Sequence, residues 1–301
     1  MVGFADKTGK YLPGMHGYFH YWTRRMNPHE APSTSLYSIA TITWRNRELI
    51  FQMTRREIIG RYQGSVMGLA WSFFNPILLL AVYTFVFSVV FKARWNVGAE
   101  QTNSEYAVAM FVGLIVHGLF AEVINRAPSL ILANANYVKK VVFPLEVLPL
   151  VSLLAALFHA LVSVVVLLAA FAWFNEYLNW TAIFFPLVIL PLVILTIGLS
   201  WMLSSFGVFI RDVSQSIGII TMVMMFLAPV VYPISAVPTE LRPWLMINPL
   251  TFIIEQGREV LIWGRMPDWI GLLAYSGVSI AVAWIGYFWF QKTRKGFADV
   301  L

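Results

Sequence analysis

The sequence has few charged residues and no cysteine. Of its 301 residues, 12% are charged and 59% are hydrophobic, and the mean hydropathy is +0.71. Soluble domains carry roughly 25% charged residues, and a globule of this size must present a large surface to water. The composition therefore predicts an integral membrane protein. The absence of cysteine excludes disulfides and thiolate metal sites.

Several motifs of nucleotide binding and catalysis are also missing. No G-x-x-x-x-G-K-[ST] phosphate loop occurs, so we expect no ATP binding of that kind. Neither H-E-x-x-H nor G-x-S-x-G occurs. His16 and His20 are spaced i, i+4, with His29 and Glu30 nearby, but such residues in a Gly/Pro-rich arm are more typical of polar surface than of a metal site. We expect neither a metal nor another cofactor.

Carboxylates are missing from the middle of the apolar segments. Proton- and ion-driven carriers keep ionisable groups there, so a carboxylate-based antiporter is disfavoured. His117 and His159 are the ionisable side chains within these segments. We expect each to bond a neighbouring helix or to face a pore as a neutral group. A membrane-embedded catalytic centre would have to use carboxylates at segment edges, such as Glu105, Glu122 and Glu146.

What the sequence does contain is a series of long apolar segments. A membrane-spanning helix needs about 20 mostly apolar residues, and helices satisfy their own backbone groups in hydrocarbon. The alternating pattern of an outer-membrane barrel is absent. The expected fold is all-α and integral to the membrane, with six transmembrane helices per subunit, at about 72–91, 106–121, 147–174, 183–210, 213–232 and 269–290.

Basic residues predict the orientation of these spans. With the N-terminus inside, the inner segments hold 16 of the 21 lysines and arginines. Cytoplasmic loops carry such an excess, so we expect both termini in the cytoplasm. Residues 1–35 contain no apolar core of a signal peptide and are expected to form a cytoplasmic extension of unknown role. The net charge of +6 is explained by this bias, and no nucleic-acid partner is expected.

Residues 44–62 predict an amphipathic helix before the first span. An apolar stripe flanked by arginines suits a helix in the headgroup layer, although Leu49, Ile50 and Met53 fall outside this stripe. A cytosolic helix packed on a partner remains the alternative. The stripe consists of Trp44, Phe51, Ile58 and Tyr62.

A proline-punctuated segment lies between the fifth and sixth spans. It contains "PLTFIIEQGREVLIW", which is apolar but too short and too charged to cross a membrane. Proline is a poor residue for a helix interior, so short helices between prolines are expected. These helices either enter the membrane and return, where protein must surround their backbone, or form a plain outer loop on the bilayer.

Aromatic side chains recur along two spans. Tyr83, Phe87 and Phe91 follow at i, i+4 and i+8 on the first span, and Met222 and Phe226 lie on the fifth. Helix packing or lipid contact explains any one of them. Together they indicate an aromatic path on which sugar rings lie weakly, and conduction requires binding that is not too tight.

The region "RREIIGRYQGSVMGLAWSFFNPILLLAVYTFVFSVVF" resembles the first-span region of membrane subunits of ABC exporters of the ABC-2 class. The likeness is closest to permeases that export O-antigen polysaccharide, with teichoic acid and capsule exporters as relatives. Met67 departs from the leucine common in that pattern. The loop 134–150, the turn 209–220 and the segment before the last span are also similar. The motif positions are Arg61, Tyr62, Ser65, Gly68, Trp71 and Pro76.

This resemblance implies that residues 36–301 form an ABC-2 transmembrane domain in a bacterial inner membrane. It implies a homodimer that pairs with two copies of a separate ATPase and conducts a lipid-linked polysaccharide. The chain would then be a transport subunit rather than an enzyme. The interfacial helix and the 134–150 loop would contact the ATPase, with Tyr137, Lys139, Lys140 and Phe143 as candidates. The two lysines are alternatively a positive-inside anchor or contacts to lipid phosphates.

The stretch before the first span would then serve the substrate's headgroup. Arg55, Arg56 and Arg61 would meet a lipid pyrophosphate or ordinary anionic lipid. Gly64, Ser65 and Gly68 are small, which predicts that helices approach closely there.

The residues leave three further functions open. Teichoic acid or capsule polymer could replace O-antigen as the cargo. An ABC-2 exporter of a small lipid or drug would share most of these features. A membrane glycosyltransferase or polymerase would require catalytic carboxylates near an interface.

Overall fold

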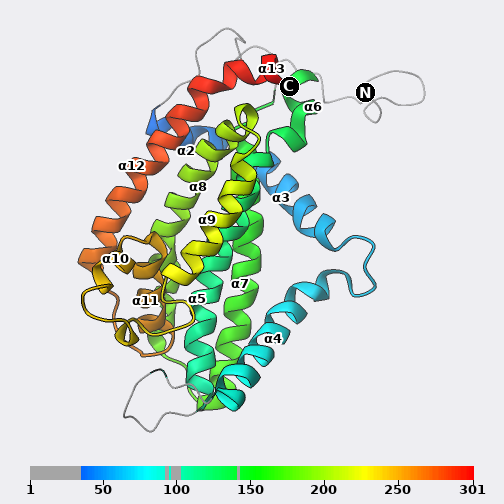
Figure 1. Ribbon diagram of the computed structural model, residues 1–301. Coiled ribbons are helices and arrows are strands. Elements are labelled where there is room, and N and C mark those ends of the chain that lie inside the picture. Colours follow the sequence, from blue (N-terminus) through cyan, green and yellow to red (C-terminus); the bar gives the residue numbers. More distant parts are fainter. Residues whose placement is uncertain (1–34, 92–94, 96–102, 141–142) are drawn as a thin grey trace. The chain divides into compact units, whose positions relative to one another are not determined.

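The computed structural model describes residues 35–91, 95, 103–140 and 143–301. Residues 34–301 form one unit, and its described part consists of helices without a strand. The long helices run roughly along one direction (Figure 1). The expected N-terminal extension lies, apart from Ser35, outside the described residues. The all-α prediction is confirmed.

The helices follow one another along the chain with short connections. They are α2 (Leu36–Arg45), α3 (Arg47–Tyr62), α4 (Trp71–Tyr83), which continues into the π-helix η2 (Thr84–Val90), α5 (Asn103–Arg126), α6 (Ala135–Lys140), α7 (Val147–Asn175), α8 (Phe185–Phe209), α9 (Val213–Leu227), α10 (Arg242–Met246), α11 (Pro249–Leu261), α12 (Trp269–Thr293) and α13 (Phe297–Val300).

Five helical segments of the described chain are long and apolar enough to cross a membrane. They are Gly68–Phe87, Glu105–Ser129, Val147–Asn175, Trp180–Phe209 and Trp269–Val300. The predicted fifth span, 213–232, is shorter than expected. Helix α9 has 15 residues, which is roughly 22 Å of helix, because Pro229 forces the preceding Ala228 into an extended conformation with ψ of 152°.

Helix α5 is longer than the predicted 106–121 segment, because two charged residues extend it instead of ending it. Glu122 pairs with Arg61, and Arg126 pairs with Glu57. Both partners lie on α3, so pairing offsets the desolvation of these charges. A hydropathy profile predicts that a spanning helix ends at such charged residues, because the profile contains no information about their ion-pair partners.

The predicted helix 44–62 divides at Asn46 into α2 and α3. Ile50 is buried against Val147 and Val151 of α7. Two residues of the predicted stripe, Trp44 of α2 and Phe51 of α3, are exposed. Helix α3 therefore has two apolar faces, one packed on α7 and one facing outward, which explains why Ile50 fell outside the stripe.

Two helix pairs form the centre of the bundle. Helix α12 packs along α8, and α5 packs along α7. The first contact is close because a Cβ added to Gly198 of α8 would lie 2.5 Å from the Cα of Ala283 in α12. A Cβ on Gly286 would overlap the Gly198 carbonyl oxygen. Small residues allow this backbone approach in membrane helices.

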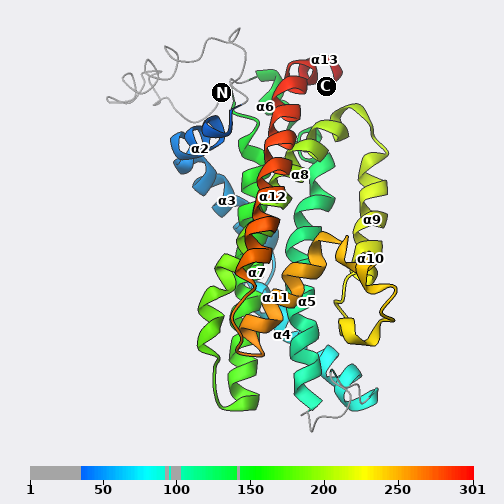
Figure 2. The same cartoon turned by 90° about the vertical axis from the view of Figure 1, so that its left-hand side faces the viewer.

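The proline-rich segment forms α10 and α11, and α11 is packed between other helices. It contacts α5 and α8 and lies in the same half of the bundle as the α7–α8 connection, whereas α6 and α13 lie at the opposite end (Figure 2). Pro249 begins α11, and the Asn248 Oδ1 accepts a hydrogen bond of 3.0 Å from the Leu250 N–H. Proline and asparagine at these positions are typical helix-start residues.

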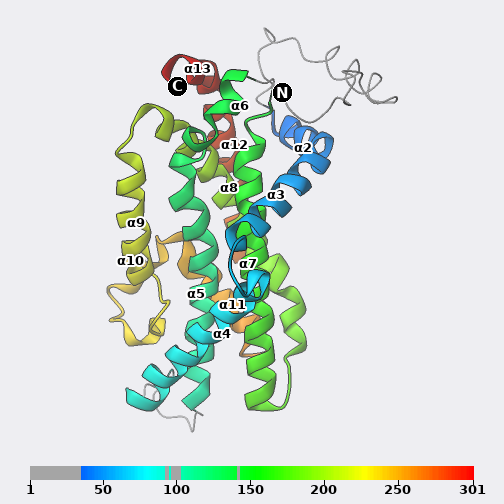
Figure 3. The same ribbon diagram turned by 90° about the vertical axis from the view of Figure 1, so that its right-hand side faces the viewer.

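Helices α3 and α4 meet at an angle, with residues 63–70 at the apex (Figures 1 and 3). Gly64 and Gly68 adopt positive φ angles of 86° and 51°, which glycine tolerates best. A Cβ on either residue would meet no atom within 4 Å. Within the described residues of a single chain no helix approaches these two glycines, and the close approach stays a prediction. Their positive φ angles turn the chain between α3 and α4.

Helix α4 covers little of the bundle. Only 17% of the Gly68–Phe87 segment is buried, against 72% of the Glu105–Ser129 segment. An apolar face of α4 is consequently left without protein contact in a single chain.

Candidate functional site

Three charged or ionisable side chains from three helices meet beneath the α3–α4 apex. The Arg61 Nη2 lies 2.5 Å from the Glu122 Oε1, and the Arg61 Nη1 lies 3.0 Å from the His159 Nδ1. That same nitrogen of His159 lies 3.1 Å from the Glu122 Oε1. Nδ1 can accept from Arg61 or donate to Glu122, but a single nitrogen cannot do both. The expectation that His159 bonds a neighbouring helix is confirmed.

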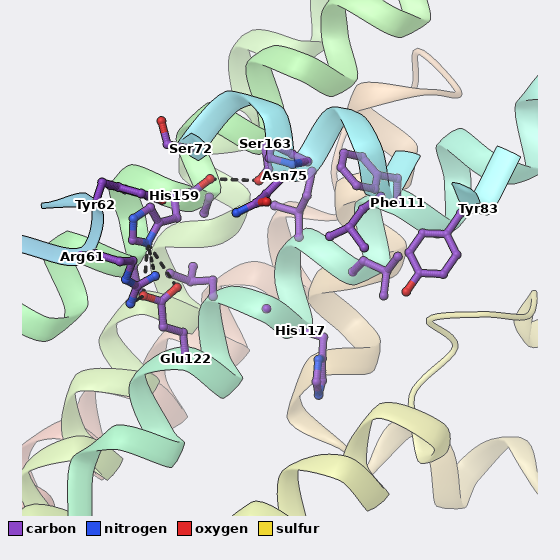
Figure 4. A pocket seen from close by; sticks show the side chains of 18 residues that line it. Arg61, Tyr62, Ser72, Asn75, Tyr83, Phe111, His117, Glu122, His159 and Ser163 are labelled. Carbon is purple, nitrogen blue, oxygen red and sulfur yellow. Dashed lines mark hydrogen bonds and ion pairs between the residues drawn. The ribbon is translucent and has the colours of Figure 1, made fainter. Parts of the chain in front are cut away.

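This cluster closes one side of a cavity of about 350 Å³, which we call the Arg61–Tyr83 cavity. In Figure 4, Arg61, Glu122 and His159 point toward one another on one side, and Tyr83 and Phe111 lie on the other. Burial raises the pKa of the Tyr62 phenol at the cavity edge. The volume falls within the range of small-molecule sites, roughly 300–1,000 Å³. Its wall also includes Ser72, Asn75, His117 and Ser163.

A second cavity of about 470 Å³ is also lined by residues of α3, and we call it the Arg56–Tyr137 groove. Arg56, Arg61 and Arg126 line it together with Glu57 and Tyr137. Glu57 forms an ion pair with Arg126. The groove therefore lies between α3 and the segment that carries α6.

The three predicted headgroup arginines differ in their surroundings. Arg55 and Arg56 are exposed, and neither forms an ion pair within the described residues. Arg61 is engaged by Glu122 and His159. Only the first two are thus available as uncompensated cations, and Arg56 faces a groove that contains further arginines.

The predicted aromatic series on the first span follows a π-helix. The Phe91 N–H donates to the Val86 carbonyl over 2.9 Å, the i→i+5 pattern that often occurs at functional sites. Ring centroids are 6.3 Å apart for Tyr83 and Phe87, and 5.7 Å apart for Phe87 and Phe91. Phe87 stacks on Tyr106 of α5, whereas Phe91 is exposed. The series thus runs from the core to the outside.

Met222 and Phe226 are exposed on α9. This helix is joined to α5 by polar contacts, because the His117 Nε2 lies 3.1 Å from the Thr221 carbonyl oxygen and the Thr221 hydroxyl donates to Asn125 over 2.8 Å. The prediction that His117 bonds a neighbouring helix is confirmed. Both aromatic segments contact α5.

The predicted ATPase-contact residues lie at the end of the bundle that carries α6. Tyr137 stacks on Phe143 with centroids 4.5 Å apart, and Phe143 is buried. The side chains of Lys139 and Lys140 lie outside the described part of the structure. Arg294 fixes this segment by donating to the Glu146 carboxylate over 2.7 Å and to the Phe143 carbonyl over 2.9 Å. Phe143 is therefore placed as a packing residue.

Arg258 of α11 is a fully buried cation that the sequence patterns did not reveal. It donates to the carbonyls of Ala109 and Val230 and to the carboxylate of Glu255, over 2.9, 3.0 and 2.7 Å. Burial lowers its pKa to about 10, so the guanidinium stays charged at neutral pH. The signal in the sequence was an arginine inside an apolar segment with Glu255 one helical turn earlier.

The carboxylates required by a catalytic function do not meet. Glu105 and Glu122 lie on the same helix, roughly 25 Å apart along its axis. Glu146 is buried beside Arg294. Within the described residues, no three metal-ligating side chains form a group, and the predicted surface histidines His16, His20 and His29 lie outside those residues.

This chain is similar over most of its length to known proteins whose names describe export or transport. A protein of Myxococcus xanthus, the O-antigen export system permease protein RfbA, is 28% identical over 255 residues, which cover 84% of this chain and 95% of that protein. A Klebsiella pneumoniae protein of the same name is 27% identical over 257 residues, with coverage of 84% and 95%. The polysialic acid transport protein KpsM of Escherichia coli is 24% identical over 238 residues, covering 77% and 88%.

The family match covers most of the bundle. Residues 48–262 match the family described as ABC-2 type transporter, from α3 to the end of α11. Together with the long apolar helices, this match shows that the chain is a multi-pass membrane protein that belongs to the ABC-2 type transporter family.

Proposed function

We propose that this chain is the transmembrane subunit of an ABC exporter that moves a lipid-linked polysaccharide, of the O-antigen class, across a bacterial inner membrane. The observation that carries the proposal is the family match over residues 48–262, joined to relatives named as O-antigen export permeases. Residues 36–301 form the transport domain with six spans and both termini in the cytoplasm, and 1–35 are an extension of it.

The energy for export comes from a separate ATPase. The chain contains no phosphate loop, so ATP hydrolysis must reach it by contact. Tyr137 and the α6 segment with Lys139 and Lys140 are the contact surface that we propose, together with α3. Arg294 holds the adjoining segment at Glu146 and Phe143 by an ion pair and a hydrogen bond, and an element that transmits motion needs such an attachment.

A second copy of the chain completes the passage. The exposed apolar face of α4 and the exposed Met222 and Phe226 on α9 flank α5, which is largely buried. In a homodimer these faces would enclose a channel whose wall includes Phe91, with Phe87 and Tyr83 behind it. Helices α10 and α11 would enter the membrane from the outer side and narrow the exit.

The headgroup of the carrier lipid would be received at α3. Arg55 and Arg56 carry uncompensated charge at the expected depth of the interface, and arginine binds phosphate oxygens in a bidentate manner. Ordinary anionic lipids share this chemistry, so competition between the lipid-linked substrate and phosphatidylglycerol distinguishes the two.

Vesicle transport tests the function. We expect that purified permease and ATPase, reconstituted with the lipid-linked polymer, move glycan into the lumen only with hydrolysable ATP. Transport that persists without ATP, or with an ATPase unable to hydrolyse it, would overturn the proposal.

Deletion of the gene distinguishes the cargo. Loss of surface O-antigen is expected, whereas loss of capsule would favour the function named for KpsM. Movement of a small lipid or drug alone would indicate a small-molecule exporter of the same family. Loss of polymer synthesis rather than export would indicate a membrane glycosyltransferase or polymerase.

A further inference from the structure

The polar side of the Arg61–Tyr83 cavity is compensated in charge. Arg61 contributes one positive charge, and the Glu122 carboxylate 2.5 Å away cancels it. A phosphate that entered would face this carboxylate as well as the guanidinium, and like charges at such distances repel. Unlike the surface around Arg55 and Arg56, this cavity is therefore poorly suited to an anion.

The cavity also contains polar groups that lack partners. The exposed Asn75 amide and the half-buried Tyr83 hydroxyl line it, and neither forms a hydrogen bond within the part of the chain that the structure describes. A hydrocarbon tail filling the space would leave both unsatisfied, which is costly away from water. The two residues are eight apart on one helical segment, roughly 12 Å along its axis, so an occupant must satisfy groups at both ends.

We propose that this cavity binds sugar units of the lipid-linked polymer, an inference that rests on the proposed function. Sugar hydroxyls both donate and accept hydrogen bonds, which suits an amide, a phenol, a carboxylate and an imidazole around one space. The apolar C–H faces of the ring suit Phe111 and Tyr83. A neutral ligand also leaves the Arg61–Glu122 pair intact.

The position of the cavity determines which part of the substrate lies where along α3. Arg61 lines both the Arg61–Tyr83 cavity and the Arg56–Tyr137 groove. A carrier phosphate held at Arg56 therefore lies near a sugar held in the cavity, because Arg61 borders both spaces. The cavity binds the first sugars of the polymer, next to its lipid, before the polymer enters the passage between the subunits.

Two neighbouring leucines of α4 provide a matched test. Leu79 lines the cavity and Leu78 does not, yet their side chains are 48% and 49% exposed. The photoreactive residue p-benzoylphenylalanine is introduced at either position in cells that make the polymer. After illumination the chain is purified and its attached glycan is measured. We expect glycan on the Leu79 variant and only background on the Leu78 variant.

A subtler variant tests the hydrogen bond. Tyr83→Phe removes one hydroxyl and should lower the glycan captured from position 79 by about fivefold, the value of one hydrogen bond in binding. Tyr177→Phe is the control, because Tyr177 is exposed, lies outside the cavity and forms no hydrogen bond in the described chain. Both variants should reach the membrane in equal amounts.

The outcomes separate the two proposals. Equal glycan from positions 78 and 79, or phospholipid instead of glycan at position 79, overturns the sugar site. So does an absence of glycan at position 79 while deletion of the gene still abolishes export, and in that case the proposed function stands. If deletion leaves the surface polymer unchanged, the proposed function itself fails.

Discussion

The guanidinium of Arg258 lies 4.3 Å from the ring centre of Trp95, so a cation from α11 stacks on an aromatic residue that precedes α5. The same side chain donates to a carbonyl of α5 and to one in the segment after α9. Arg258 thus connects α11 to α5, to the segment after α9 and to Trp95. If α10 and α11 narrow the exit as proposed, Arg258 fixes their position.

Replacing Arg258 with lysine should destabilise this part of the protein. Lysine retains the charge but lacks the planar fork, so it cannot keep the hydrogen bonds to Ala109, Val230 and Glu255 together. Each lost hydrogen bond from a charged donor costs about 1.5–3 kcal/mol. Thermal unfolding of the purified chain in detergent measures the loss, and hydrogen exchange should rise chiefly in α11.

The control for that substitution is Arg265→Lys. Arg265 is exposed and lies 3.6 Å from Glu259, and exposed pairs contribute about 0–1 kcal/mol. An equal decrease in melting temperature for both variants would contradict the role assigned to Arg258.

Gly286→Ala should separate α8 from α12, because the added methyl group would overlap the Gly198 backbone. The nearest atoms all belong to the Gly198 backbone and cannot rotate away. We therefore expect overpacking to destabilise the protein by about 1–3 kcal/mol. The matched control is Gly277→Ala on the same helix, where a Cβ meets nothing within 4 Å. Alanine is the better helix former, so helix propensity should leave Gly277→Ala as stable as the wild type or more so. If the control variant melts as early as Gly286→Ala, the close contact with Gly198 does not explain the loss.

The positions of most helices could be predicted from hydropathy. The segment predicted at 147–174 forms α7 at Val147–Asn175, because a long uncharged run has no stable alternative to a helix in hydrocarbon. The end of α9 was missed although Pro229 was visible. The hydropathy of the following residues, Val230 and Val231, outweighed the steric effect of one proline on the residue before it.

The candidate site could be predicted only in part, because pairing is a tertiary property. Arg55, Arg56 and Arg61 are alike in sequence, yet only Arg61 lies within reach of Glu122 and His159. These partners are distant along the chain, and no local pattern links them. Glycine spacing likewise does not distinguish a turn with positive φ, as at Gly64, from a close helix contact, as at Gly286.

Arg294→Ala should lower the stability of the protein and should also lower the export obtained per ATP hydrolysed, because it releases the segment that we propose contacts the ATPase. The change leaves the buried Glu146 carboxylate without its cation and the Phe143 carbonyl without its donor. Surface polymer is measured together with ATPase activity of the reconstituted complex. We expect reduced export per ATP hydrolysed, whereas Lys295→Ala, whose side chain is exposed and unpaired in the described chain, should leave that ratio unchanged. An unchanged ratio in the Arg294 variant would remove the coupling role of this ion pair.

Exchanging the charges of Glu57 and Arg126 tests whether the interfacial helix must stay joined to α5. Arg126→Glu alone would place two carboxylates together, and Glu57→Arg alone would add a fourth arginine to the groove that Arg56, Arg61 and Arg126 line. Either single change should reduce stability and export, and the double exchange should recover most of both. The pair is partly exposed, with side chains 39% and 18% accessible, so its coupling in a double-mutant cycle should be about 1 kcal/mol. Additive losses in the double variant would mean that the two residues act separately, and that α3 is held to the bundle by Ile50 and its apolar neighbours alone.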